Sequence, residues 1–259
     1  MDTSRLLEPP DEIDERDALM IGRVALSALL MTSSAAAFEV EVAPDTPDAE
    51  DQFGLVTARA RLMATVSSYE KDSPIYREDE PADNIYQVIN GAARATKHLS
   101  DGRRLIGDFY FPGDIFGLNS NTCDGFAAEA VIDTTVRSVK RRRLESVAHL
   151  DAQIALQLWK ISAAKLRRAE DHMLMVSQRS ASRRVAAFLL AMDHRRLATT
   201  GTMALPMGRL DIGDYLGLTF ETISRVLSKF LNEEIIGFAE SSRDIVLLNR
   251  ERLGSLCAA

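Results

Sequence analysis

The fold is decided by the stretch Leu210-Asp-Ile-Gly-Asp-Tyr-Leu-Gly-Leu-Thr-Phe-Glu-Thr-Ile-Ser-Arg-Val-Leu-Ser-Lys-Phe230. It predicts two helices joined by a tight turn. The first helix runs from about Asp211 to Leu216, with Asp211 as its N-cap. Gly217 then ends this helix, because glycine readily takes the left-handed conformation. The second helix begins after a further N-cap, Thr219, and continues to the end of the stretch.

The second helix has an apolar face and a separate polar face. The apolar residues recur at helical spacing: Phe220, Ile223, Leu227 and Phe230. The polar face carries Glu221, Ser224 and Arg225 at positions i, i+3 and i+4. In the DNA major groove, arginine pairs with guanine and glutamate accepts from cytosine. We therefore expect these three residues to read bases, whereas an ordinary amphipathic helix with a solvated face is the alternative.

Further residues within and around the stretch predict contacts with the DNA backbone and a β-hairpin wing. Arg209, Thr219 and Thr222 are candidates for phosphate contacts, which position a protein without specifying a sequence. Two short, mainly apolar runs come after the second helix, 235–239 and 244–248. They predict a small β-hairpin, the wing of a winged helix. The hairpin favours a DNA reader over a solvated helix face.

The charge of the chain is unevenly distributed. The 259 residues carry a net charge of −7, which by itself disfavours DNA binding. Residues 1–51 hold thirteen acidic residues against three arginines, so the remaining 208 residues carry +3. Residues 140–196 hold thirteen Lys/Arg against five acids. Nucleic-acid affinity depends on such local charge rather than on the total.

Cysteine usage and hydropathy restrict the class of protein. Cys123 and Cys257 are the two cysteines, which excludes a four-cysteine zinc or iron–sulfur site within one chain and fits a reducing compartment. The apolar run 24–37 contains hydroxyl residues and is too short to span a bilayer. The acidic opening is unlike a secretory signal. We expect a cytoplasmic protein that makes no contact with a membrane.

The chain divides into four parts. Residues 1–51 form an acidic, partly disordered N-terminal extension with a helix over about 16–36 and a Pro/Asp-rich linker. Residues 52–143 contain short β-like runs separated by turn signals, which predict a small barrel or roll. The candidate strands are 63–69, 85–89, 92–97, 105–111 and 134–139, with Asn90-Gly91 as the strongest hairpin signal.

The third part, residues 144–178, is expected to be one helix over about 144–177. Its apolar and small residues recur at alternating spacings of four and three: Ala155, Trp159, Ser162, Leu166, Ala169, Met173 and Val176. This a/d pattern favours a dimer seam over an internal core helix, which usually shows a wider apolar stripe. The fourth part, residues 179–259, adds a helix over 180–196 and a loop over 197–209 before the helix-turn-helix.

This order of parts resembles the cyclic-AMP-receptor/Fnr superfamily of bacterial transcription regulators. The residues that carry the resemblance are 107–117 in the roll, GDFYFPGDIFG, and 212–225 in the reader, IGDYLGLTFETISR. It implies an α+β fold with a cyclic-nucleotide-binding-like β-roll, a long dimerisation helix and a C-terminal winged helix-turn-helix. Glu-x-x-Ser-Arg is similar to the Fnr/FixK branch, whose site is TTGAT-N4-ATCAA. Phe220 stands where the cyclic-AMP-receptor branch has a further arginine.

The sensory part departs from the two familiar patterns of this superfamily. A cyclic-nucleotide pocket there has Phe-Gly-Glu-Leu and a later Arg-Ser or Arg-Thr pair, whereas this chain has Leu118 and Asn119 after Phe-Gly and no such arginine. The iron–sulfur branch uses an N-terminal cysteine cluster and one roll cysteine, and Arg137 stands at that roll position. We therefore expect neither cyclic AMP nor a cluster, and no cofactor. Cys123 is a possible redox residue.

These features leave three hypotheses. The first is a homodimeric, sequence-specific regulator of FixK type, most simply an activator that contacts RNA polymerase and needs no small effector. The second keeps DNA binding but makes the roll a ligand or redox sensor. The third is a DNA-processing enzyme with a helix-turn-helix, which would need a metal-binding acid cluster or an activated nucleophile that the sequence does not display.

Overall fold

The protein is described by a computed structural model that covers residues 64–78, 80, 83–118, 125–196, 203–239 and 244–258. The predicted acidic extension, its helix and Cys123 lie outside these residues. Within them, no helix combines the length and apolar character needed to cross a membrane.

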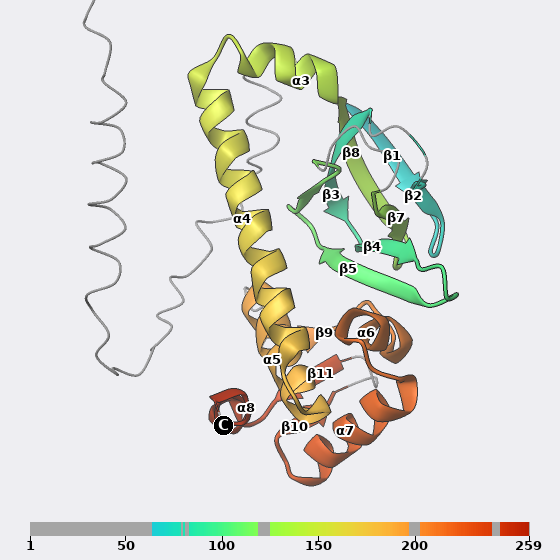
Figure 1. The fold of residues 1–259 in the computed structure, drawn as a ribbon, viewed down its shortest axis with the longest axis vertical. Coiled ribbons are helices and arrows are strands. Elements are labelled where there is room, and N and C mark those ends of the chain that lie inside the picture. The colour runs from blue at the N-terminus through green and yellow to red at the C-terminus, as the bar shows by residue number, and fades with distance from the viewer. Residues whose placement is uncertain are drawn as a thin grey trace, which may run out of the picture. The chain divides into compact units, whose positions relative to one another are not determined.

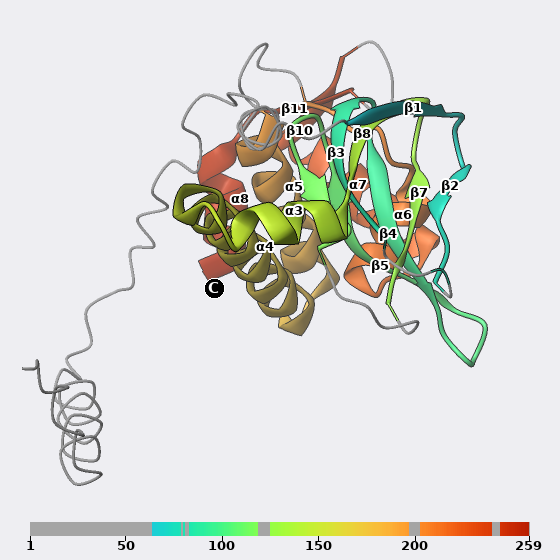
Figure 2. The ribbon, with the colours of Figure 1, turned by 90° about the horizontal axis from the view of Figure 1, so that it is seen from above.

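The roll consists of two four-stranded antiparallel sheets (Figure 1). The first sheet has the order β1 (Thr65–Tyr69), β8 (Thr134–Lys140), β3 (Asn84–Asn90) and β6 (Ile115–Phe116). The second has the order β2 (Pro74–Tyr76), β7 (Ala127–Ala130), β4 (Ala93–His98) and β5 (Arg104–Tyr110). Figure 2 shows β1, β8 and β3 side by side. The predicted roll and its five candidate strands are confirmed.

Aromatic rings fill the space between the two sheets. The buried rings of Tyr86, Tyr110 and Phe116 stack with centroids 4.8 to 5.2 Å apart. Val88 and Val136 pack in the same cluster. Three strands, β2, β6 and β7, were not predicted, because runs of two to four residues are too short to show an alternating pattern.

The prediction of a hairpin at Asn90-Gly91 is wrong. The turn joins β3 to β4, which pair with different partners in different sheets. Gly91 has φ +91°, and a Cβ there would lie 2.4 Å from the carbonyl oxygen of Asp133. The dipeptide therefore carries the chain from one sheet to the other past a tight backbone contact, which requires the same residue types as a hairpin turn.

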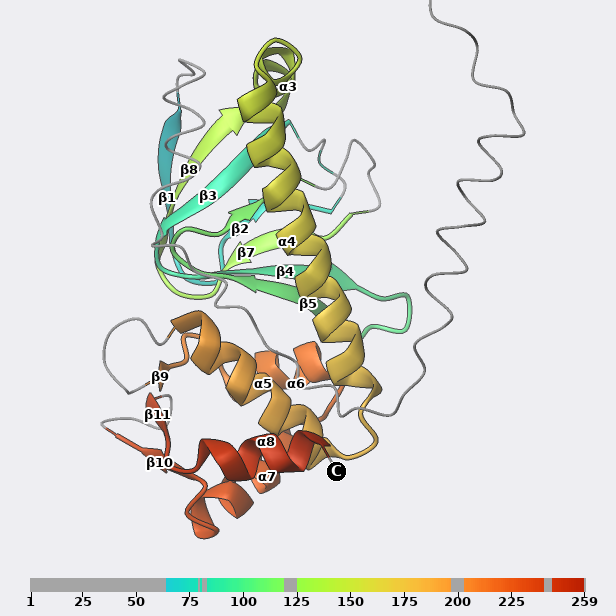
Figure 3. The same ribbon diagram turned by 90° about the vertical axis from the view of Figure 1, so that its left-hand side faces the viewer.

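The predicted helix over 144–177 is two helices, α3 (Arg141–Ala148) and α4 (Ala152–Ser177). Asp151 separates them, because its carboxylate accepts from the backbone N–H groups of Gln153, at 2.9 Å, and Ile154. This N-cap starts a new helix where the apolar pattern alone indicates continuity. Figure 3 shows α4 running past the roll to the C-terminal helices.

The C-terminal part is a winged helix-turn-helix. Its elements are α5 (Ala181–Arg196), β9 (Met203–Ala204), α6 (Arg209–Leu216), α7 (Phe220–Asn232), β10 (Ile236–Phe238), β11 (Asp244–Leu247) and α8 (Arg250–Ala258). The predicted hairpin of the wing is confirmed as β10 and β11, which are antiparallel. The predicted loop 197–209 is wrong at residues 203–204, which pair with β11 as a third wing strand. Helix α8 was not predicted.

Candidate nucleic-acid interface

The first helix of the reader, α6, begins earlier than the sequence predicts. It starts at Arg209 with Gly208 as its N-cap, so the assignment of Asp211 as the cap is wrong. Asp211 lies in the first helical turn, is buried, and accepts hydrogen bonds from Arg94 and Arg104 of the roll. Its short polar side chain therefore serves a tertiary ion pair instead of a local cap.

The turn between α6 and α7 agrees closely with the prediction. Gly217 has φ +63° and ends α6 in the left-handed conformation. The backbone N–H of Leu218 donates to the carbonyl of Gly213 at 2.9 Å. Thr219 is the N-cap of α7, because its hydroxyl accepts from the backbone N–H of Thr222 at 3.3 Å. These bonds satisfy helix ends and fix the angle between the two helices.

Helix α7 buries one face and exposes another. The buried face consists of Ile223, Val226, Leu227 and Phe230, which pack into the core of the reader. Phe220 was predicted on this face, but it is 48% exposed. The prediction is wrong because Phe220 is the first residue of α7, where no preceding helical turn covers it.

The predicted base-reading residues lie together on the opposite side of α7. Glu221 and Arg225 are exposed and Ser224 is half-buried. Arg209 donates to the hydroxyl of Ser224 at 3.3 Å, so a residue predicted to contact phosphate lies beside one predicted to contact bases. Arg225 donates to the hydroxyl of Thr222 at 3.3 Å.

The N-terminus of α7 stabilises an anion. The pKa of Glu221 is held below its ordinary value, first by a backbone N–H at the helix start and then by the hydroxyl of Thr219 and the charge of Arg225. Glu221 is therefore ionised and an acceptor only, which suits a base amino group.

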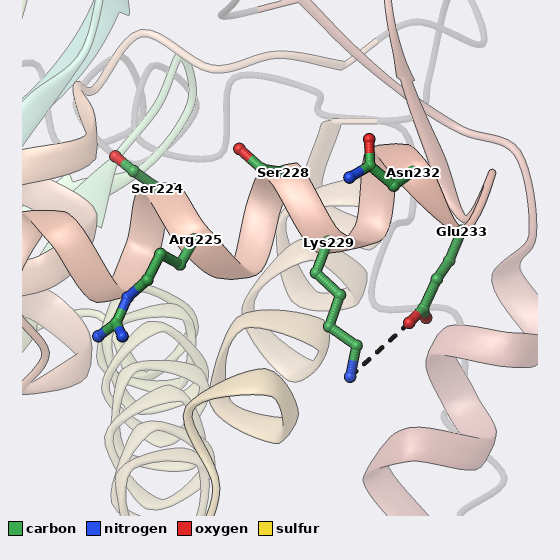
Figure 4. Close-up of a pocket in the computed structure, with 6 residues that line it drawn as sticks. All are labelled: Ser224, Arg225, Ser228, Lys229, Asn232 and Glu233. Carbon is green, nitrogen blue, oxygen red and sulfur yellow. Dashed lines mark ion pairs between the residues drawn. The ribbon is translucent and has the colours of Figure 1, made fainter.

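Polar residues continue along α7 beyond the predicted triplet (Figure 4). They form two rows: Ser224, Ser228 and Asn232 in one, and Arg225, Lys229 and Glu233 in the other. Lys229 pairs with Glu233 at 3.7 Å. The four residues beyond Ser224 and Arg225 were not predicted, although their spacing of four from these two places them on the same surface.

Helix α4 has two faces with different surroundings. Its inner face packs on the chain itself, with Ile154 and Met175 buried. The predicted seam lies on the outer side, where Trp159 is 71% exposed, Leu166 62% and Met173 63%. Ser162 and Ala169 are also exposed and Val176 is half-buried. The residues that the structure describes thus leave an apolar stripe exposed along α4.

A cavity of about 290 Å³ lies between the roll and α4. Aromatic residues Tyr76, Tyr110 and Phe126 line it from the roll, and Lys165 and His172 line it from α4. Burial lowers the pKa of Lys165. The ring of His172 also stacks on Tyr215 of α6, with centroids 3.8 Å apart, so the lining of the cavity reaches the reader.

Comparison with known proteins assigns both halves of the chain. Residues 66–151 match the cyclic nucleotide-binding domain, and residues 183–256 match the Crp-like helix-turn-helix domain. The nitrogen fixation regulation protein FixK of Azorhizobium caulinodans is 38% identical over 198 residues, which cover 75% of this chain and 79% of that protein.

Two further proteins show the same similarity. The transcriptional activatory protein AadR of Rhodopseudomonas palustris is 37% identical over 74% of this chain and 80% of that protein. The solved structure of FixK2 from Bradyrhizobium japonicum has 58% identity and a TM-score of 0.72, and the match covers 76% of this chain and 99% of that one. These relatives are regulators and not enzymes. The chain belongs to the Crp/Fnr family and is a FixK-like, DNA-binding transcription regulator.

Proposed function

We propose that the protein is a homodimeric activator that reads a TTGAT-N4-ATCAA palindrome without cyclic AMP or an iron–sulfur cluster. The observation that carries the proposal is the exposed cluster at the start of α7. Glu221 and Arg225 contact base edges there, and Ser224 assists from its position beside Arg209. Arginine and glutamate have the donor and acceptor geometry that distinguishes G·C pairs in the major groove.

Phe220 adds an apolar contact to this reading. Its ring is about half exposed at the end of α7 that enters the groove. An apolar side chain beside the base-reading residues suits the C5-methyl group of thymine. Arg209, Thr219 and Thr222 contact phosphates around this point and set the register of α7 on the duplex.

Dimerisation through α4 supplies the two-fold symmetry that a palindrome requires. The stripe containing Trp159, Leu166 and Met173 is exposed on each chain, and a heptad spacing of this kind packs against a second copy. A two-fold dimer places its recognition helices about one DNA turn apart. The role as an activator, and hence RNA polymerase as a partner, is proposed from the similarity to FixK and to the activatory protein AadR.

Fluorescence anisotropy with the palindrome and a scrambled duplex at the same salt concentration tests this function. We expect Arg225→Ala to weaken binding to the palindrome by about 1–3 kcal/mol and binding to the scrambled duplex much less. Lys229→Ala is the matched control, because it removes the same charge one turn further along α7. Equal affinity of Arg225→Ala and wild type for the palindrome would refute the assignment.

A second candidate function rests on the cavity beside α4. Its volume of about 290 Å³ and its connection to α6 through His172 favour a regulator gated by a small ligand. A thermal shift on adding candidate ligands, together with selective DNA binding only in their presence, would support this alternative. Selective binding by the purified protein alone supports the effector-independent function.

A further inference from the structure

Four charged residues join the roll to the first helix of the reader. Arg94 on β4 donates from Nη1 to both carboxylate oxygens of Asp211 on α6, each at 3.2 Å. Arg104 on β5 contacts the same carboxylate and also donates from Nε to Asp214 at 2.7 Å. We call this set the clamp. It connects residues more than a hundred positions apart in the sequence.

The clamp is largely withdrawn from water. The side chain of Arg94 is 7% exposed and that of Asp211 11%, while Arg104 and Asp214 are 22% and 20% exposed. Glu129 forms a further ion pair with Arg94, with Oε2 of Glu129 2.9 Å from Nη2 of Arg94. Ion pairs shielded in this way interact far more strongly than pairs in water, provided that each charge is satisfied.

The clamp acts on α6, and α6 is coupled to the recognition helix. Asp211 and Asp214 are three residues apart and so lie on one side of α6. Leu216 is buried in the core, and Tyr215 packs against Phe109 of β5 with ring centroids 5.3 Å apart. The α6–α7 turn is fixed by the bond from Leu218 to Gly213. The ion pairs that hold α6 against β4 and β5 therefore also restrict the position of α7.

We propose that Arg94 and Arg104 are positioning residues for DNA reading, which hold the reader against the roll in the orientation that binds the palindrome. This inference rests on the proposed function. An apolar contact is non-directional, so two surfaces joined by it can shift relative to each other. A carboxylate that accepts hydrogen bonds from two guanidinium groups is instead fixed in one position. Shielded ion pairs add little net stability, so orientation is the property that they contribute.

The variants Arg104→Gln and Asp214→Asn test the clamp, because the two side chains are partly exposed and belong to none of the hydrophobic core clusters. Arg103→Gln is the matched control. Arg103 is the neighbouring residue, is 76% exposed, and pairs with Asp101 within the β4–β5 turn. The double variant Arg104→Gln/Asp214→Asn tests whether the two residues act together.

Each single variant is expected to bind the palindrome about tenfold more weakly, which corresponds to a fall of the binding-competent fraction to about one tenth. The double variant should be no weaker than either single one. The two substitutions change the net charge in opposite directions, so a direct electrostatic effect on DNA would have opposite signs. Binding to a scrambled duplex should change within about twofold, and hydrogen exchange in α6 should accelerate without DNA.

The proposal would be overturned if Arg104→Gln bound the palindrome as tightly as Arg103→Gln does, or more tightly than the wild type. Loss of the cooperative thermal transition in a variant would show a merely structural role and overturn it too. A wild-type protein that does not prefer the palindrome contradicts the proposed function. In that event hydrogen exchange still decides the clamp, since faster exchange in α6 for Arg104→Gln but not for Arg103→Gln supports it.

Discussion

Replacing Gly213 with alanine should break the turn between α6 and α7. Gly213 is buried in α6, and a Cβ at this position would lie 2.6 Å from the carbonyl oxygen of Leu218. That oxygen belongs to backbone in the turn and leads directly to the N-cap Thr219, so it cannot rotate away as a flexible side chain would. The added methyl group forces the two helices apart.

The expected change in the free energy of unfolding is the sum of two losses and one gain. Overpacking against fixed backbone costs about 1–3 kcal/mol. The strained turn also weakens the 2.9 Å bond from the N–H of Leu218 to the carbonyl of Gly213, which is worth about 1 kcal/mol. Alanine in a helix interior regains about 1 kcal/mol relative to glycine. The net effect is a loss of about 1–3 kcal/mol in the free energy of unfolding.

Gly254→Ala is the internal control. Gly254 also lies within a helix, α8, but a Cβ there meets nothing within 4 Å. It should raise the free energy of unfolding by up to about 1 kcal/mol, because only the helix propensity changes. Urea unfolding at one fixed protomer concentration measures both variants, since a dimer makes stability depend on concentration. If Gly213→Ala had the same free energy of unfolding as Gly254→Ala, the close contact at Gly213 would be refuted.

Three further substitutions test separate parts of the molecule. Leu166→Glu should convert the protein to monomers in sedimentation experiments. Leu150→Glu, at a position that is 89% exposed and outside the seam, should leave the dimer intact. Dimers in both cases would exclude α4 as the interface. Phe220→Ala should weaken palindrome binding by about 1 kcal/mol, through lost apolar contact, without changing unfolding by more than about 0.5 kcal/mol; unchanged affinity would remove Phe220 from the interface. Asp193→Asn should cost about 1–3 kcal/mol in urea unfolding, because the buried carboxylate accepts two bonds from Arg250 of α8, and a cost below about 0.5 kcal/mol would contradict that role.

Local features of the chain were predictable from its sequence because they depend on neighbouring residues. Gly217 takes the left-handed conformation, and Thr219 caps α7, as their residue types imply. The wing is evident from two apolar runs close in sequence. The polar positions of Glu221, Ser224 and Arg225 are set by helical spacing alone. Each of these inferences uses residues fewer than fifteen positions apart.

The errors arose where a residue type suits two environments. Asn90-Gly91 suits a hairpin and also a crossing between sheets, and in the fold this turn lies against Thr134, whose hydroxyl accepts from the backbone N–H of Ala92 and which is more than forty residues away in the sequence. Asp151 is an acidic residue within an apolar pattern, so the pattern concealed the cap that divides the helix. Sequence spacing shows which residue types are available but not which of two partners a side chain meets.

Asp211 links this ambiguity to DNA recognition. A local rule assigns it to a helix cap, yet its partners are Arg94 and Arg104, more than a hundred residues away. In the proposed function the base contacts depend on the local pattern of α7, whereas the proposed clamp makes the position of α7 depend on ion pairs that no periodicity reveals. A relative that keeps Glu221 and Arg225 but loses the partners of Asp211 would keep the base-reading residues, yet would bind the palindrome more weakly and prefer it less over a scrambled duplex. The identity of the bases that are read and the strength of the preference for them should thus depend on different residues in this protein.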